Sequence, residues 1–395
     1  MKGLIWIIVT LLVVGGVWYL FMGLEPPTSE APSGITPGAQ KTIPLKVGAM
    51  LPLTGDGAAY GLPIQKAGQL AVDEINASGG IGGRTFQVIW EDGQCDAKSA
   101  SAATQKLVNV DKVKYILGGV CSSEVLAGAP LAESSEVLWI SPSATSPDIT
   151  NAGDYIFRTA PSDALAGKIA AQYAYNTMEA KTVAVVSENK DYTQGLRKVF
   201  TEFFIGLGGK VTADEVYNEG DTDFRTQFLK VKTAKPDVVY LLPQTPASGL
   251  LLVKQLRDQK ITAKLLTAEV LPGRDVVKEN AKLLEGVVGI EPYFNAETPE
   301  AQAFVAAYKT ANNNEELAFP SFMANYYSQF YLLKTAVETA GDDSMKVKDW
   351  LYTVKDWKHV LGSLTFDSNG DPLAEYQILE LRNGEVKPLE TVRPE

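Results

Sequence analysis

The sequence predicts an α/β protein with two parallel β-sheets in two lobes. Three observations support this prediction. Strand and helix patterns alternate from residue 45 onward, an order that is typical of parallel sheets with right-handed crossovers. The pattern then restarts at Lys181. A single sheet holding all these strands would be unusually wide, so we expect two sheets, each with its own core.

In the first half, the expected strands are short apolar runs and the expected helices carry apolar residues at helical spacing. The segment 61–77 places Ile64, Ala71 and Ile75 on one helical face, and a pair of glycines after it ends the helix. The expected strands are 45–53, 85–92, 113–117 and 137–140, and the helices are 61–77 and 97–110.

The second half repeats the alternation of strands and helices and then continues with three helices in a row. Its expected strands are 181–187, 210–216, 237–242 and 264–268, with helices at 194–207, 223–234 and 247–259. Three later helices, 299–311, 321–340 and 344–353, lead to a final strand pair, 359–366 and 375–381. The turn 367–371 is expected to join that pair. It resembles a calcium loop only superficially, because it lacks the closing Glu and the flanking helices.

Two hydroxyl-rich turns mark the candidate site, GGVCSSE at 118–124 and ISPSATSPD at 140–148. Each follows a buried-strand pattern, where the next helix should begin. A helix start leaves backbone N–H groups without partners and carries partial positive charge. Ser and Thr there either cap the helix or help to bind an anion. Neighbouring parallel strands end at the same edge of a sheet, so the two turns together predict a cradle for a carboxylate.

The composition is ordinary for a globular α/β protein, with 45% hydrophobic and 21% charged residues. A net charge of −11 argues against nucleic acid or anionic lipid headgroups as partners. The one histidine, His359, has no Gly-x-Ser-x-Gly turn to accompany it, so a histidine-based triad finds no support. We expect no catalytic activity, no metal and no cofactor.

Two cysteines, Cys95 and Cys121, cannot by themselves form a four-ligand zinc site. They lie at adjacent strand ends of the predicted sheet, and a disulfide is possible if their Cα atoms come within about 7 Å. It would close a loop of roughly 25 residues, worth about 3 kcal/mol in the chain-entropy model. Two buried free thiols are the alternative.

The amino-terminal segment 4–22, LIWIIVTLLVVGGVWYLFM, is uncharged and about long enough to cross a bilayer. Its aromatic end makes a poor cleavage site, so we interpret 1–23 as a membrane anchor, with a cleaved signal peptide as the alternative. Residues 24–44 are rich in Pro, Ser and Thr and read as a linker. The folded region is therefore expected on the extracytoplasmic face of the membrane.

Taken together, these pieces resemble the Leu/Ile/Val-binding proteins of ABC importers, which are type I periplasmic binding proteins. The resemblance covers nearly all of 45–385 and rests on the order and spacing of several pieces: PLTGDGAAYG (52–61), DEINASGGIGG (73–83), EDGQCD (91–96), CSS (121–123), SPSATSP (141–147), DYTQGL (191–196) and TAEV (267–270). It implies two Rossmann-like lobes with three hinge crossings, near 157–161, 289–292 and 366–373. Lobe 1 would hold 45–160 and 290–367, and lobe 2 would hold 161–289 and 368–395.

The resemblance also implies a site for an amino acid. Ser122 and Thr145 match residues that bind the ligand carboxylate. Ser143, with Ala144 beside it, matches a position that offers its main-chain carbonyl to the ammonium, and Glu269 matches the lobe 2 carboxylate that pairs with it. A zwitterion needs donors at one end and acceptors at the other, which agrees with this assignment. Without the resemblance, Glu269 could be an ordinary surface residue.

Tyr60 and Tyr192 match aromatic residues that line the cleft from opposite lobes, although either could be a packing residue. The chain departs from the family at 243–246, where Pro-Gln-Thr-Pro replaces a frequent aromatic position. A polar Gln244 or Thr245 there puts the branched-chain specificity in question, while the amino-acid class rests on the residues named above.

The resemblance thus implies a monomeric extracytoplasmic substrate-binding protein that captures a branched-chain or other neutral amino acid and delivers it to ABC transporter membrane subunits. A membrane-tethered sensor with the same fold is the alternative, and the short segment before the apolar run favours transport. A carboxylate-pair enzyme is a third possibility, since Glu91, Asp92, Asp191 and Glu269 are acids near strand ends. Nothing in the sequence sets a separation for any two of them.

Overall fold

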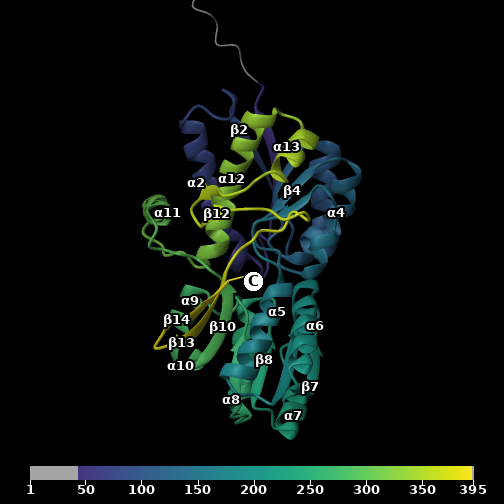
Figure 1. Ribbon diagram of the computed structural model, residues 1–395, viewed down its shortest axis with the longest axis vertical. Helices are drawn as coiled ribbons and strands as arrows, with labels where there is room; N and C mark the ends of the chain where they lie inside the picture. Colours follow the sequence, from purple (N-terminus) through teal and green to yellow (C-terminus); the bar gives the residue numbers. More distant parts are fainter. Residues whose placement is uncertain (1–42, 394–395) are drawn as a thin grey trace, which may run out of the picture. The chain divides into compact units, whose positions relative to one another are not determined.

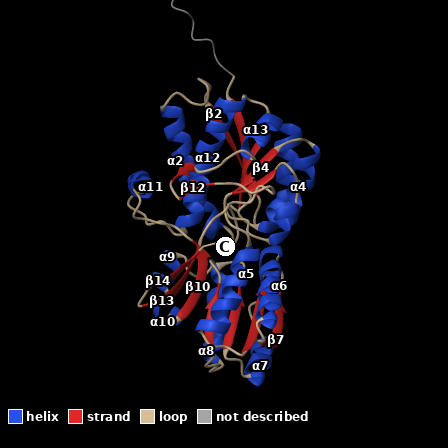
Figure 2. Ribbon diagram, in the orientation of Figure 1, coloured by secondary structure: helices blue, strands red, loops and turns tan. Residues whose placement is uncertain are grey.

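Two β-sheets organise residues 43–393, the part of the chain that the computed structural model describes (Figures 1 and 2). The first sheet is parallel throughout and contains five strands, in spatial order: β2 (Phe86–Asp92), β1 (Leu45–Leu51), β3 (Tyr115–Gly118), β4 (Leu138–Ser141) and β5 (Ile156–Arg158). Every residue of β3, β4 and β5 is buried. Strands covered on both faces are expected to be continuous apolar runs, which is how β3 and β4 appear in the sequence.

Helices cover both faces of the first sheet (Figure 1). On one face, Leu117 belongs to a core that includes α2 (Ala58–Ala77) and α12 (Pro320–Ala340). On the other face, Ile116 packs with α3 (Ala97–Gln105) and α4 (Ser122–Ser134). The remaining helical segments of this lobe are the π-helical turn η1 (Lys106–Val110), the 3-10 turn η2 (Pro147–Asn151), α11 (Pro299–Ala311) and α13 (Ser344–Leu351).

The second sheet is mixed, with seven strands in the order β14 (Glu385–Val392), β13 (Tyr376–Arg382), β10 (Val287–Pro292), β9 (Lys264–Thr267), β8 (Val238–Leu242), β6 (Thr182–Glu188) and β7 (Lys210–Tyr217). The strands from β10 to β7 are parallel, while β13 runs antiparallel to both of its neighbours. The helical segments of the second lobe are α5 (Asp163–Gln172) with the π-helical turn η3 (Tyr173–Thr177), α6 (Asp191–Gly206), α7 (Arg225–Ala234), α8 (Pro246–Asp258), α9 (Arg274–Glu279) and α10 (Ala281–Leu284).

The chain passes between the two sheets three times. It leaves the first sheet after β5, returns after β10, and crosses again before β13. A buried ion pair ties two of these passages together, because the guanidinium of Arg158 contacts the carboxylate of Asp371 through two hydrogen bonds of 2.6 and 2.7 Å. The Arg158 side chain is fully buried, so this pairing satisfies a charge that water cannot reach.

The predicted final strand pair is wrong. The turn 367–371 is present, with Asp367 accepting hydrogen bonds from the backbone N–H groups of Asn369 and Asp371. The strands on either side of it separate, however, apart from one bridge between Phe366 and Pro372. Residues of β13 are buried along most of their length and pair with β10 and β14 in the second sheet. The earlier segment instead folds on itself as the hairpin β11 (Trp357–His359) and β12 (Gly362–Leu364).

The predicted membrane anchor at 4–22 lies outside the described residues, as does nearly all of the predicted linker. Within 43–393, no helix combines the length and the apolar character needed to cross a bilayer.

The Arg158–Asp371 pair gives a testable prediction about stability. Asp371→Ala leaves a buried guanidinium without its counter-ion, so we expect the free energy of unfolding to fall by about 3 kcal/mol or more. Urea unfolding followed by circular dichroism measures this loss. Asp223→Ala is the matched control, because it removes the carboxylate from the solvent-exposed pair with Arg225. Equal midpoints for the two variants would contradict the structural role of the buried pair.

Candidate ligand-binding site

A pocket lies where the carboxyl ends of parallel strands from both sheets meet. Its lining comes from both lobes: Tyr60, Val120, Cys121, Ser122, Ser143, Thr145, Tyr192, Gln244, Glu269, Val270 and Phe322. It contains about 360 Å³ of space free of protein atoms, part of which is open to solvent. A space of this size suits a small molecule.

The first turn is built by glycine and a helix start. Gly118 ends β3 with a φ of +129°, and a Cβ there would lie 2.1 Å from the carbonyl oxygen of Met50. Only glycine permits this close approach. The chain then enters α4 at Ser122, whose hydroxyl accepts a hydrogen bond of 3.1 Å from the backbone N–H of Ser146. That bond joins the first turn to the second.

The second turn uses most of its hydroxyls to hold its own shape. Ser141 Oγ donates to the carbonyl of Gly119 at 2.7 Å, and Ser143 Oγ donates to the carbonyl of Val120 at 3.1 Å. Thr145 differs, since its buried hydroxyl has no hydrogen-bond partner. Hydrogen bonds to the backbone therefore account for much of the serine and threonine content of this turn. The Thr145 hydroxyl makes no such bond. Ala144 is fully buried and does not line the pocket.

A disulfide between Cys95 and Cys121 fixes the start of α4, with Cα atoms 5.2 Å apart, as the sequence predicts. The buried carboxylate of Glu124 supports the same region by accepting hydrogen bonds from the backbone N–H groups of both cysteines. Burial raises the pKa of Glu124 to about 7, while those backbone bonds act in the opposite direction.

Glu269 faces these turns from the second lobe. It follows β9, its side chain is buried, and its Oε2 atom has no hydrogen-bond partner. Burial raises its pKa, and its own backbone N–H opposes that rise. The nearby hydroxyls of Tyr192 and Thr145 also lack hydrogen-bond partners. A low-dielectric pocket with an unpaired carboxylate favours a cation as its occupant.

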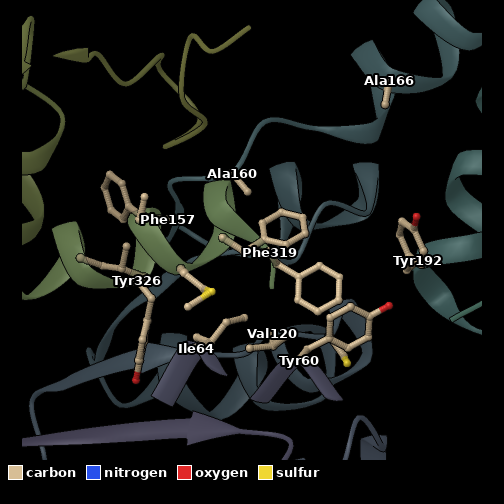
Figure 3. Packing of buried hydrophobic residues seen from close by; sticks show 14 of the residues in the cluster. Tyr60, Ile64, Val120, Phe157, Ala160, Ala166, Tyr192, Phe319 and Tyr326 are labelled. Carbon is tan, nitrogen blue, oxygen red and sulfur yellow. The ribbon is translucent and has the colours of Figure 1, made fainter. Parts of the chain in front are cut away.

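Aromatic rings close the pocket from two sides. Tyr60, near the start of α2, packs against Phe319 with ring centroids 4.6 Å apart, and Tyr192 lies across from it near the start of α6 (Figure 3). The Tyr60 hydroxyl donates to the carbonyl of Gln244 in the other lobe at 3.3 Å. This hydrogen bond spans the two lobes directly.

Asp163 is a second buried acid that the sequence analysis missed. It is the first residue of α5, and its backbone N–H donates to the carbonyl of Thr145 at 2.8 Å. Both of its carboxylate oxygens are buried without partners. Burial raises its pKa, and the charge of Glu269 raises it further. In the sequence it looked like an ordinary acid in a first helical turn, so no local pattern marked it.

The structure thus brings together six of the seven predicted ligand contacts, all except Ala144. The pocket-lining residues that sequence reasoning missed are Val120, Val270 and Phe322, which are plain core residues by sequence pattern. Among the residues that line the pocket, none is Lys, Arg or His.

Comparison with known proteins identifies the family. Residues 44–385 match the model of the periplasmic binding protein family, and the chain belongs to that family, with its type I α/β fold. This confirms the resemblance seen in the sequence.

Three relatives illustrate the match. The leucine-, isoleucine-, valine-, threonine-, and alanine-binding protein of Pseudomonas aeruginosa is 32% identical over 332 residues, covering 83% of this chain and 87% of the relative. The crystal structure of the leucine-binding protein LivK of Thermotoga maritima has a TM-score of 0.82 at 26% identity, covering 89% and 99% of the two chains. The substrate-binding protein LivJ of Streptococcus pneumoniae in complex with isoleucine has a TM-score of 0.81 at 31% identity, covering 89% and 100%.

Proposed function

We propose that this protein is the extracytoplasmic substrate-binding component of an ABC importer and captures a neutral amino acid between its two lobes. The observation that carries the proposal is the polarity of the pocket. Hydroxyl groups and a helix start lie on the lobe 1 side, and a buried carboxylate with one unpartnered oxygen lies on the lobe 2 side.

The chemistry of each end fits one half of a zwitterion. The start of α4, with Ser122 and the free hydroxyl of Thr145, offers donors to an α-carboxylate. Glu269 offers an acceptor to the α-ammonium, and main-chain carbonyls of the second turn, including that of Ser143, can share it. Because no cationic side chain lines the pocket, a ligand with an acidic side chain would find no counter-charge. This favours neutral amino acids.

The relatives support the same class of ligand. The Pseudomonas aeruginosa protein is named for five neutral amino acids, and the Streptococcus pneumoniae structure contains isoleucine. We extend the amino-acid class to this chain and propose no catalytic role for it.

Burial of the polar groups supports ligand capture by hinge closure. Ser122 and Thr145 are each 1% exposed and Glu269 is 5% exposed, so a ligand can reach them only when the lobes separate. Closing the empty pocket would bury the Glu269 carboxylate without a partner, which is costly. A bound ammonium removes that cost. We therefore propose that Glu269 makes closure depend on ligand.

The proposed location and partners rest on the amino-terminal sequence and the family. We propose that residues 4–22 anchor the protein in the membrane and that 24–44 let a monomeric binding domain reach the transporter's membrane subunits. The disulfide fits this location, because disulfides persist outside the cytoplasm.

Glu269→Gln tests the ammonium contact. The substitution keeps the size of the side chain and removes its charge, so we expect amino-acid affinity to fall by at least ~2 kcal/mol, or about 30-fold. Isothermal titration calorimetry with the amino acid that most raises the melting temperature measures this change. Glu202→Gln, on the exposed side of α6, is the control. An unchanged dissociation constant in Glu269→Gln would remove this residue from the site.

Glu269→Met tests the coupling of closure to ligand. Small-angle scattering of the wild type should show a smaller radius of gyration with saturating amino acid than without it. In the variant the empty pocket no longer buries a charge, so the ligand-free protein should already be more compact than the ligand-free wild type. If the ligand-free profiles of the two proteins coincide, Glu269 is not what holds the empty lobes apart.

A further inference from the structure

Gln244 is a polar side chain of the pocket to which the proposed binding of a zwitterion gives no role. Gln244 lies in the loop between β8 and α8, is 7% exposed, and lines the pocket beside the disulfide. Its side-chain Nε2 lies 3.8 Å from Cys121 Sγ. The apolar and aromatic part of the pocket lining includes Val120, Val270, Phe322 and Tyr60.

The backbone of Gln244 is held firmly in place. Its N–H donates to Glu188 Oε2 at 3.0 Å, and the same carboxylate oxygen accepts from Ser248 at 2.9 Å and from Tyr217 at 3.1 Å. Its carbonyl accepts from the Tyr60 hydroxyl across the lobes. Prolines on both sides, at 243 and 246, further limit the loop. The structure thus fixes the point from which this side chain enters the pocket.

The amide itself is poorly satisfied. Among residues 43–393, its contact with Cys121 Sγ is the one hydrogen bond that it makes, and sulfur is a weak acceptor. A primary amide can donate two hydrogen bonds and accept two. Burying it against an aliphatic ligand would leave most of this capacity unused, which disfavours that ligand.

We propose that Gln244 selects for a neutral amino acid whose side chain carries a hydroxyl or an amide, in preference to a purely aliphatic one. The inference rests on the proposed function and narrows it. The zwitterion would be held by Ser122, Thr145 and Glu269, while the Gln244 amide exchanges hydrogen bonds with the end of the ligand's side chain. A site built to hydrogen-bond a ligand group discriminates more strongly than an apolar pocket of the same size.

Isosteric pairs of amino acids test this directly. Threonine and valine have nearly the same shape and differ by a hydroxyl in place of a methyl group, and glutamine and methionine have side chains of similar length that differ by an amide. Calorimetric titration of the wild type should show the polar member of at least one pair binding about tenfold tighter or more. In Gln244→Met, the affinity for that polar member should fall and the affinity for its apolar partner should rise.

These opposite changes in affinity distinguish a specificity role from a structural one. General damage to the loop would weaken the binding of both members of a pair. Gln69→Met, on the exposed face of α2, is the control and should leave both affinities unchanged. Valine and methionine binding at least as tightly as threonine and glutamine in the wild type would overturn this inference alone. Failure of every amino acid to bind would overturn the proposed function, and the inference with it.

Discussion

A buried carboxylate with an unpartnered oxygen is the constraint around which the binding pocket is built. Glu269 stands at the end of a central strand of the second sheet and faces hydroxyl-rich turns of the first. Asp163 lies behind the same turns with both of its oxygens unpaired. Buried acid oxygens without hydrogen-bond partners would weaken a purely structural core. A positively charged group in the space between the lobes would stabilise these acids.

The surrounding structure keeps that space polar and narrow. The Ser122–Ser146 hydrogen bond joins the two lobe 1 turns, and the Cys95–Cys121 disulfide ties the first of them to the loop after β2. Arg158 ties the first crossing to the third through Asp371. Each of these contacts removes freedom from groups that would otherwise have to be ordered when a ligand binds. The hydroxyl of Thr145 stays available because Ser141 and Ser143 do the bracing.

Local patterns in the sequence were sufficient for most elements. The helix predicted at 299–311 has the observed bounds of α11, and the buried runs before the two turns became β3 and β4. The predicted pairing of the last two strands was wrong because strand pairing depends on tertiary packing. β13 is better buried next to β10 than it would be beside the strand that precedes it in sequence. The turn between them was read correctly, since Asp and Gly fix it locally.

The site was predictable only in part, for a related reason. Ser122, Thr145 and Glu269 stand at strand ends, where position itself is informative, and the family resemblance brought them together. Asp163 had no such signal. Phe322 lies on a helix that is far from the two turns along the chain. Ala144 was included as a neighbour in sequence, yet it is fully buried and does not line the pocket.

The most direct test of this account asks whether both charged ends of a ligand are needed. A calorimetric titration would compare an amino acid that binds with two analogues, one lacking the ammonium and one lacking the carboxylate; for threonine these are β-hydroxybutyrate and isopropanolamine. The account predicts that each analogue loses at least ~2 kcal/mol of binding free energy, because each leaves one end of the pocket unpaired. Either analogue binding as tightly as the amino acid would contradict it.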